Sequence, residues 1–569
     1  MKTFTLNLGL TGIAFFLVLL PHSSGGQAQS EPVQSPNVIR SNTRLVIVDV
    51  VATDGQGNPV TDLTEKDFTV LESGRPQKIE SFSFQNPSTP VEQPASLPPN
   101  VISNVPRRAT TSLNVILLDR LNGVSSSHIY AQDRIVKYLE SGAAIQPTAV
   151  YVLDHKLSMV QNFTSENKVL KDALNAVRPG GVARVSTIDV AASPYATKGD
   201  FHTDEKSIEI TLNALRQLAR TLKGYPGRKN LLWVSEAFPV NLTIEGIPQD
   251  TSPNAAIIAR TGVTGPTPIT GSLPPASGET ALPSGSVGGA TDTLPDGAPD
   301  RLSTGEDRSY AAEIARLADA LMDAHVALYP IDAGGMGSAN RIAAQSNMRD
   351  MADRTGGVAF YNRNDVEIGI AKGISDGSTY YALSYYPDNK VWNGHFRRIE
   401  VRAARAGVNL HFRTGYYALD PAVAAKREAA ELGDEFAYAM TYEAPPLAAL
   451  RFQASVILPA AGTRKVTVNF AVDPHTVRFE HQDDGMEHGS VSCAVAAFSE
   501  KGDAVKGFTV DVATVPAKLD GAQYQKLQKG YYPCKREFEL KPGKYALRLG
   551  AADRNGHAIG TLLTHVTVN

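Results

Sequence analysis

The residues with the clearest chemical potential stand at the end of one apolar run. Residues 113–119 are mostly apolar until the run ends on the carboxylate of Asp119, and Asn122, Ser125 and Ser126 follow shortly after. Such a run is typical of a buried parallel strand, whose last side chains emerge at the carboxyl edge of a sheet. Carboxylate, amide and hydroxyl oxygens gathered there can bind a hard cation or hydrogen-bond a partner. Whether Asp119 holds a metal is therefore the main question about function.

The segment 110–377 has the pattern needed to position these residues. Apolar strand-like runs alternate with amphipathic stretches at helical spacing, which predicts crossover helices between parallel strands. We therefore expect an α/β domain with a doubly wound, mostly parallel sheet. The predicted strands are 113–119, 149–153, 157–160, 230–235, 325–332 and 356–361, and the predicted helices are 127–141, 164–177, 204–222, 309–324, 337–354 and 365–374. Within this domain, residues 241–304 are rich in Pro, Gly, Ser and Thr and are predicted to be a mobile insertion.

The segments on either side of this domain have the pattern of β structure. Residues 43–86 predict a small N-terminal β module that contains a hairpin of 68–71 with 78–84, and the Pro-rich residues 87–106 predict a linker. Residues 378–420 alternate like antiparallel strands and have no crossover helices, so we expect them to pair with the N-terminal module. A helical linker at 421–440 leads to 445–569, whose seven or eight short strands predict an immunoglobulin-like β-sandwich.

Composition and the first residues limit the choice of partners. The chain has 569 residues and a net charge of -3, from 55 basic and 58 acidic residues. It lacks the positive charge that nucleic acid or an anionic membrane surface attracts, so neither is expected as a partner. Residues 1–28 have the charged start, apolar centre and small-residue end of a signal peptide cleaved after Ala28. We expect an exported protein of the periplasm, the cell surface or the medium, with no membrane span after cleavage.

Two cysteines, Cys493 and Cys534, are the only ones in the chain. An even number in an exported chain favours a disulfide between them, and closing a loop of this length contributes about 4 kcal/mol in the chain-entropy model. Two buried free thiols are the alternative.

An ordered series of short motifs carries a family resemblance. The motifs, in this order, are Val48-Asp-Val-Val, Asp67-Phe, Leu117-Leu-Asp119, Gln161-Asn-Phe-Thr164, Arg228-Lys-Asn-Leu-Leu-Trp-Val, Thr355-Gly-Gly and Arg413-Thr-Gly-Tyr416. Over roughly residues 43–420 the chain resembles the VWFA-related domain family abundant in Acidobacteria, whose α/β domain is of von Willebrand factor type A. The resemblance implies the element order strand, helix, antiparallel hairpin, two helices, strand.

The same resemblance implies a candidate metal site. Metal-binding members of the wider superfamily hold one divalent cation through Asp-x-Ser-x-Ser after the first strand, a loop Thr and an Asp after the fourth strand. Here the first motif is Asp119-Arg-Leu121-Asn-Gly123, and Glu236 stands where the later Asp is expected. Asp119 is the candidate Mg²⁺ ligand, with Asn122, Ser125 and Ser126 as substitute oxygens. Because two ligand oxygens are missing, a degenerate, metal-free motif without a cofactor is favoured.

No catalytic pattern accompanies this site in the sequence. A nucleophile elbow and paired zinc-ligand spacing are both missing, and the polar residues 480–488 read as a hairpin turn around Asp484-Gly485. We therefore expect a non-enzymatic protein that binds another protein, as an adhesin or scaffold, through Asp119, Asn122, Ser125, Ser126 and Glu236. The alternatives are a metal-dependent adhesin with a non-standard ligand set, an envelope hydrolase with a spatially assembled site, and a structural envelope component.

Overall fold

The computed structural model describes most of the chain from residue 44 onward. The described residues are 44–86, 97–98, 100–104, 112–123, 125–141, 146–177, 186–188, 203–236, 311–334, 341–459, 463–506 and 510–568. The predicted signal peptide at 1–28 and the predicted insertion at 241–304 lie outside these residues.

A six-stranded sheet of order β11-β10-β6-β7-β8-β9 forms the centre of the α/β domain. Its strands are β6 (Ser112–Asp119), β7 (Thr148–Leu153), β8 (Leu157–Thr164), β9 (Ser186–Ile188), β10 (Arg228–Ser235) and β11 (Val326–Asp332). Neighbours among β11, β10, β6 and β7 are parallel, whereas β8 is antiparallel to both β7 and β9. The expectation of a mostly parallel sheet is confirmed.

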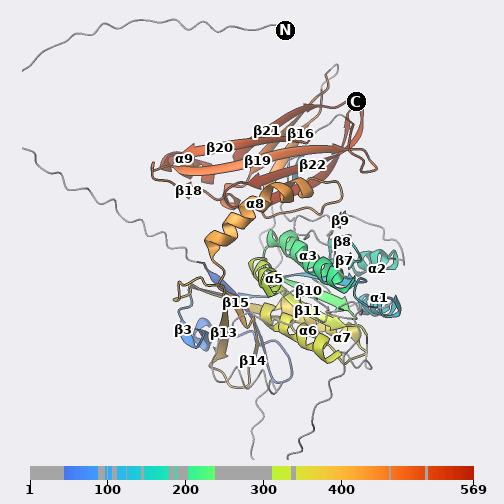
Figure 1. The fold of residues 1–569 in the computed structure, drawn as a ribbon, viewed down its shortest axis with the longest axis vertical. Helices are drawn as coiled ribbons and strands as arrows, with labels where there is room; N and C mark the ends of the chain where they lie inside the picture. Colours follow the sequence, from blue (N-terminus) through green and yellow to red (C-terminus); the bar gives the residue numbers. More distant parts are fainter. Residues whose placement is uncertain are drawn as a thin grey trace, which may run out of the picture. The chain divides into compact units, whose positions relative to one another are not determined.

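Helices cover both faces of this sheet (Figure 1). On one face lie α3 (Thr203–Lys223), α5 (Ala311–Asp323) and α6 (Arg341–Thr355), and on the other lie α1 (Ser125–Glu140), α2 (Asn167–Asn175) and α7 (Val366–Ser378). Side chains alternate across a strand, so Leu117 of β6 packs with the α3 face while Leu118 packs with the α1 face. The chain order β6, α1, β7–β8 hairpin, α2, α3, β10 matches the order that the resemblance implies, with the short β9 added before α3.

The N-terminal strands pair with strands that follow the α/β domain. One sheet has the order β14-β1-β12-β4 and a second has the order β15-β13-β2-β3. The strands are β1 (Val46–Thr53), β2 (Phe68–Glu72), β3 (Arg75–Gln77), β4 (Ser81–Gln85), β12 (Tyr380–Tyr385), β13 (Phe396–Ala403), β14 (Asn409–His411) and β15 (Gly415–Tyr417), with a 3-10 turn η1 (Glu65–Asp67) before β2. We call these two sheets the β module. They share one apolar core.

The C-terminal region is a β-sandwich of two sheets. These have the orders β21-β17-β16-β5 and β18-β19-β22-β23, with β20 paired to β19. The strands are β5 (Val101–Ser103), β16 (Phe452–Ile457), β17 (Lys465–Val472), β18 (Glu480–His481), β19 (Glu487–Phe498), β20 (Asp511–Leu519), β21 (Tyr532–Glu539), β22 (Gly543–Asp553) and β23 (Ile559–Val568), with η2 (Pro474–Thr476) and α9 (Gly521–Gln528) between strands. Helix α8 (Pro421–Ala439) precedes β16, and the Asp420 side chain accepts a hydrogen bond from Ala422 N at its start.

Two local predictions were wrong, and one helix was missed. The hairpin of 68–71 with 78–84 does not form, because Ser73 and Gly74, both at positive φ, turn β2 directly into β3, and β4 joins β12 instead. The predicted strand 356–361 is reduced to one parallel bridge between Ile331 and Phe360. Helix α9 was not predicted; an Asp520–Gln523 capping box starts it.

The predicted linker 87–106 also contains a strand of the sandwich. Strand β5 pairs antiparallel with β16. The Asn104 side chain donates to Leu447 O at 2.9 Å and to Leu450 O at 2.8 Å, and accepts from Phe452 N at 2.7 Å. The sandwich is therefore built from both sides of the α/β domain, which the predicted boundary at 445 missed.

Candidate functional site

The sheet reverses its direction of winding between β6 and β10. From β6 the chain builds outward to β7, β8 and β9, and then returns to add β10 and β11 on the other side of β6. In open α/β sheets, ligands bind outside the carboxyl ends of the strands at such a switch point. Asp119 ends β6, and Ser235 ends β10 beside it, because Val234 pairs with Leu118 in the parallel register. The candidate site is therefore the edge formed by Asp119, Ser235 and the residues around them.

Asp119 is a buried carboxylate with both oxygens already engaged. Oδ1 accepts hydrogen bonds from the backbone N–H groups of Leu121 and Asn122, each at 3.0 Å. Oδ2 accepts from Asn122 Nδ2 at 2.9 Å, Trp233 Nε1 at 3.0 Å and Ser235 Oγ at 2.9 Å. The backbone donors come from the turn that follows β6, where the chain must reverse into α1. Asp119 therefore serves to fix this turn to β10.

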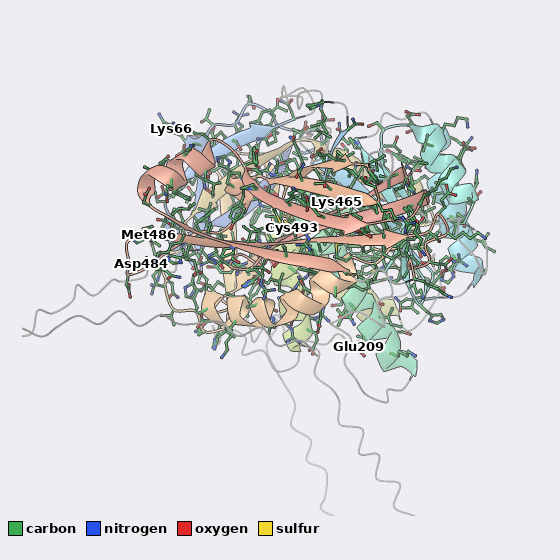
Figure 2. All side chains as sticks on the ribbon, turned by 90° about the horizontal axis from the view of Figure 1, so that it is seen from above. Lys66, Glu209, Lys465, Asp484, Met486 and Cys493 are labelled. Carbon is green, nitrogen blue, oxygen red and sulfur yellow. The ribbon has the colours of Figure 1, made fainter. Side chains whose placement is uncertain are left out.

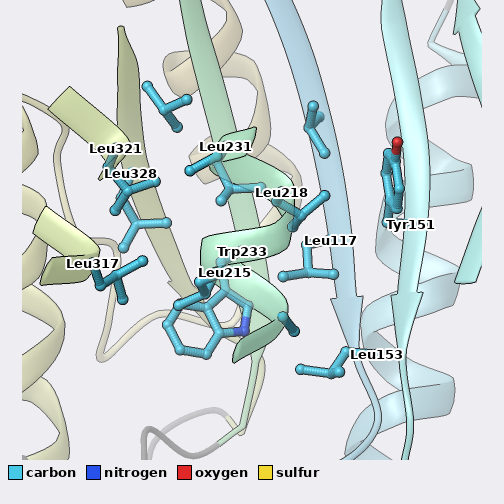
Figure 3. Close-up of a cluster of buried hydrophobic side chains, with 14 of the residues drawn as sticks. Leu117, Tyr151, Leu153, Leu215, Leu218, Leu231, Trp233, Leu317, Leu321 and Leu328 are labelled. Atoms are coloured by element: carbon cyan, nitrogen blue, oxygen red, sulfur yellow. The ribbon is translucent and has the colours of Figure 1, made fainter. Parts of the chain in front are cut away.

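The donors reach Asp119 from two segments, the turn after β6 and strand β10, and α3 contacts one of them. Trp233 and Ser235 lie two positions apart on β10, so both side chains face the α3 side of the sheet. Asn122 Nδ2 also donates to Thr211 Oγ1 of α3 at 2.9 Å. Figure 3 shows the Trp233 indole among leucines that include Leu215 of α3 and Leu317 of α5. We call Asp119, Asn122, Thr211, Trp233 and Ser235 the aspartate node. Trp233, Ser235 and Thr211 were missed from sequence. Only the β6–β10 register brings Trp233 and Ser235 to Asp119, and only the packing of α3 brings Thr211 to Asn122.

The aspartate node does not fit a divalent cation. Three donors already point at Oδ2, so their hydrogens occupy the positions that a cation bound to this oxygen would need. Leu121, at the first lost serine position, packs its side chain against the apolar core on the α3 face. Burial raises the pKa of the Asp119 carboxyl, although the hydrogen bonds from Asn122, Trp233 and Ser235 oppose that rise. Within the described residues, no group of three His, Cys, Asp or Glu side chains is placed to hold a metal ion.

The other predicted site residues are distributed unevenly around the node. Asp119 and Asn122 are buried, at 1% and 8% exposure, whereas Ser126 in the first turn of α1 is exposed. Ser125 begins α1, but its side chain lies outside the described structure. Glu236 is half-buried against Gly123, whose φ of 129° is unfavourable for other residues and where an added Cβ would lie 2.7 Å from Glu236 Cβ. The structure thus brings Asp119, Asn122 and Glu236 to one edge and exposes Ser126 beside them.

Two large apolar side chains are exposed on the helices next to this edge. Ile129 in α1 is 61% exposed and Ile368 in the first turn of α7 is 47% exposed. The two helices contact each other: the Tyr130 hydroxyl donates to Asn364 O just before α7, and Arg134 Nη1 lies 3.8 Å from Glu367 Oε1. Both isoleucines lie near the N-terminal ends of their helices, which start at the carboxyl edge of the sheet. We call Ile129, Ile368 and Ser126 the edge surface.

The polar residues 480–488 form a turn, as predicted. Asp484 and Met486 lie at the tip of the β18–β19 hairpin (Figure 2), and Gly485 takes a φ of 74°. His488 Nε2 lies 2.9 Å from Asp484 Oδ2, and Lys518 Nζ lies 2.9 Å from the same oxygen. These exposed pairs are satisfied within the hairpin and its neighbouring strand.

Cys493 and Cys534 are buried free thiols in the structure, and they face each other from opposite sheets of the sandwich. Cys493 lies on β19 (Figure 2) and Cys534 on β21. Burial raises the pKa of Cys493, and a hydrogen bond from Cys493 lowers that of Cys534. Their oxidation to a disulfide stays a prediction, which intact mass measurement under non-reducing conditions would test.

Comparisons with known proteins give limited information. No family model and no curated protein matches the chain. Among solved structures, it is similar to a von Willebrand factor type A protein from Catenulispora acidiphila, with 9% identity, a TM-score of 0.25 and coverage of 63% of this chain and 81% of that one. It is also similar to three N-terminal domains of the type V pili tip protein Mfa5 from Porphyromonas gingivalis, with 9% identity, a TM-score of 0.23 and coverage of 93% and 99%. These scores are too low to carry an argument about function.

Within the described ranges, no helix is both long enough and apolar enough to cross a membrane.

Proposed function

We propose that this chain is an exported, non-enzymatic protein that binds another protein through the edge surface of its α/β domain. The carrying observation is the position of Ile129 and Ile368, which are exposed beside the carboxyl edge of the sheet at its switch point. Exposed apolar side chains at such an edge favour a protein partner, because burying them on binding releases water from apolar surface. The signal-like sequence at 1–28 supports a partner outside the cytoplasm.

In this proposal, the aspartate node positions the partner surface and does not contact the partner. Asp119 holds the turn after β6, and that turn sets where α1 begins and where Ser126 and Ile129 stand. A protein partner would then gain apolar contact at Ile129 and Ile368 and polar contact at Ser126 and Glu236. Metal-dependent adhesion is disfavoured, because five donors already surround the Asp119 carboxylate.

Site-specific photocrosslinking tests the proposal. A photoreactive amino acid is placed at Ile129 or at Ile368 and exposed to the envelope fraction of the source cells. The matched control is Ile457, which is 52% exposed on β16 of the sandwich. We expect one saturable crosslinked product from each edge position and none from Ile457, with the Ile129 product lost in the Ile368→Asp variant. Equal crosslinking from all three positions, or none that saturates, would contradict binding through the edge surface.

A further inference from the structure

A small cavity of about 20 Å³ lies where the β module meets the amino end of the parallel sheet. Its charged or titratable lining consists of Asp49, Arg228, His325, Arg354 and Arg413, and the rest of the lining is apolar except for Thr355. A cavity of this size has room for one water molecule or one monatomic ion and for nothing larger. It is separate from the edge surface, which lies at the opposite end of the strands.

Two of the three arginines in this lining already have a carboxylate partner. Arg354 Nε lies 2.6 Å from Asp350 Oδ2 on its own helix. Arg228 Nη1 lies 4.0 Å from Asp49 Oδ2, and His325 Nδ1 lies 3.9 Å from the same oxygen. Among the described residues that line the cavity, Asp49 is the only carboxylate, and Arg228 and His325 share it.

Arg413, in the segment between β14 and β15, has no carboxylate partner among the described residues. It is 8% exposed, and its Nε and Nη2 both donate to Gly415 O, at 3.2 and 3.0 Å. Asp319 and Asp323 of α5 are each paired with Arg44 instead, at 2.7 and 2.6 Å. Burial, and then the charge of Arg44, lowers the pKa of Arg413 to about 10. The Arg413 guanidinium is therefore a buried charge without a direct counter-charge, which costs folding free energy.

Arg413 and Arg228 approach each other at Gly356. Arg228 Nη2 donates to Gly356 O at 2.7 Å, and a Cβ added at Gly356 would lie 2.9 Å from Arg413 N. Guanidinium groups donate hydrogen bonds and accept none, so a ligand beside them must be an acceptor. One monovalent anion would balance the charge of Arg413, and a protonated His325 would only add to the positive excess. A water molecule fits the space but leaves that charge unbalanced.

We propose that this cavity binds one monatomic anion, a halide such as chloride, beside Arg413 and Arg228. The bound ion joins two parts of the chain, because Arg413 belongs to the β module and Arg228 begins β10 of the α/β domain. A halide that binds only the folded chain stabilises it by mass action. The proposal does not depend on the edge surface, since neither isoleucine of that surface lines the cavity.

Thermal unfolding of the full chain in sodium chloride and in sodium gluconate, at equal ionic strength, tests this proposal. Gluconate is the matched control, because it carries the same charge and is too large for the cavity. We expect chloride and bromide to raise the melting temperature saturably, by about 2 °C at a concentration several times the Kd. Equal melting temperatures in chloride and gluconate, or a rise that does not saturate, would overturn the proposal.

Variants locate the effect. Arg413→Gln is expected to abolish the chloride-dependent rise, whereas Arg75→Gln, at an exposed arginine on β3 of the same β module, keeps it. Ala318→Val places two more methyl groups against the cavity without altering a charge, and it should abolish the rise as well. This second variant keeps the test valid if Arg413→Gln fails to fold. A full chloride-dependent rise in both cavity variants would overturn the proposal.

Anomalous scattering from crystals grown in bromide identifies the occupant directly. We expect one bromide peak in the cavity, in contact with Arg413, and no peak there in crystals of Ala318→Val. Electron density in the cavity without an anomalous signal would show that a water molecule fills it, and that result would also overturn the proposal.

Discussion

At the carboxyl end of the parallel sheet Asp119 is surrounded by neutral donors, whereas at the amino end a half-buried carboxylate, Asp49 of β1, lies beside the basic side chains of Arg228 and His325. Asp49 Oδ2 is 4.0 Å from Arg228 Nη1 and 3.9 Å from His325 Nδ1. Burial would raise the pKa of Asp49, but the His325 hydrogen bond and the nearby charges of Arg228 and Lys229 bring it below its usual value. The same type of side chain is thus held by dipoles at one end and by charges at the other.

The difference indicates which end of the sheet forms a fixed interface with another part of the chain. At the amino end, Arg228 also donates to Gly356 O at 2.7 Å, and Lys229 Nζ donates to Ala324 O at 2.7 Å. These buried charges depend on Asp49, which the β module supplies, because removing one partner leaves the other charge uncompensated. The aspartate node takes its donors from within the α/β domain. The carboxyl end can therefore present a surface to a partner without losing its internal order.

Asp119→Ala is expected to have the largest effect. It leaves the donors of Trp233, Ser235 and Asn122 buried without an acceptor, which costs about 4 kcal/mol of unfolding free energy. Urea unfolding with and without Mg²⁺ measures this loss. Ser126→Ala, which changes an exposed side chain nearby, is the control and should change stability by less than about 0.5 kcal/mol. A Mg²⁺-dependent stabilisation of the parent chain that disappears in Asp119→Ala would refute the metal-free node.

Asp49→Ala is expected to have the second largest effect, a loss of about 3 kcal/mol of unfolding free energy, because Arg228 and Lys229 lose their counter-charge. Asp49→Asn, which keeps the shape of the side chain and removes its charge, separates charge from packing in the same unfolding experiment. It should lose nearly as much unfolding free energy as Asp49→Ala, because Arg228 is left without its counter-charge in both variants. An Asp49→Asn variant as stable as the parent chain would remove the distinction between charges and dipoles.

Lys229 gives the amino end a pH dependence that the aspartate node lacks. Burial lowers the pKa of Lys229 to about 7, below its usual value. A lowered lysine pKa contributes stability that is present above the unfolded-state pKa, near 10.5, and is lost as the pH falls toward 7. The parent chain should therefore lose on the order of 2 kcal/mol relative to Lys229→Met between pH 9 and pH 7. Parallel stability curves for the two chains would contradict the assignment.

The smallest effect is expected at the edge surface. Replacing both Ile129 and Ile368 by Asp should change the unfolding free energy by less than about 0.5 kcal/mol, because both side chains are largely exposed. Thermal melting monitored by circular dichroism measures this. A large loss would mean that the isoleucines pack within the domain and are not available to a partner.

Sequence periodicity predicted the elements of the α/β domain well, because buried parallel strands and amphipathic helices leave strong local patterns. Residues 113–119, 230–235 and 325–332 were all predicted as strands and lie in β6, β10 and β11. Residues 378–420 were expected to pair with the N-terminal module, but β12 was not predicted as the partner of β4, because β4 was assigned to a hairpin with β2 from the local pattern alone. Strand β5 is three residues long in a Pro-rich stretch, and its partner lies some 350 positions later in the chain.

The candidate site was predicted only in part for a similar reason. The sequence identified Asp119 as the residue at the edge, but which groups hydrogen-bond to its two oxygens depends on how β10 and α3 pack. Trp233 belongs to a motif of the resemblance but nothing in that motif ties it to Asp119, and Thr211 belongs to none. They join the aspartate node only through the parallel register of β6 with β10 and the packing of α3 on that face. Which donors reach a buried carboxylate depends on the tertiary structure. The sequence therefore showed that the motif is degenerate but not which groups hydrogen-bond to Asp119.

Strand β5 has a consequence for the order in which the chain can fold as it is synthesised. The α/β domain lies in sequence between the two halves of the β module, and β5 precedes the domain while its partner β16 follows it. A chain synthesised from its N-terminus can complete the α/β domain before the β module, and the β module before the sandwich. Residues 101–103 cannot pair with β16 until residues 452–457 have been made. The sheet that contains β5 and β16 is therefore expected to form last.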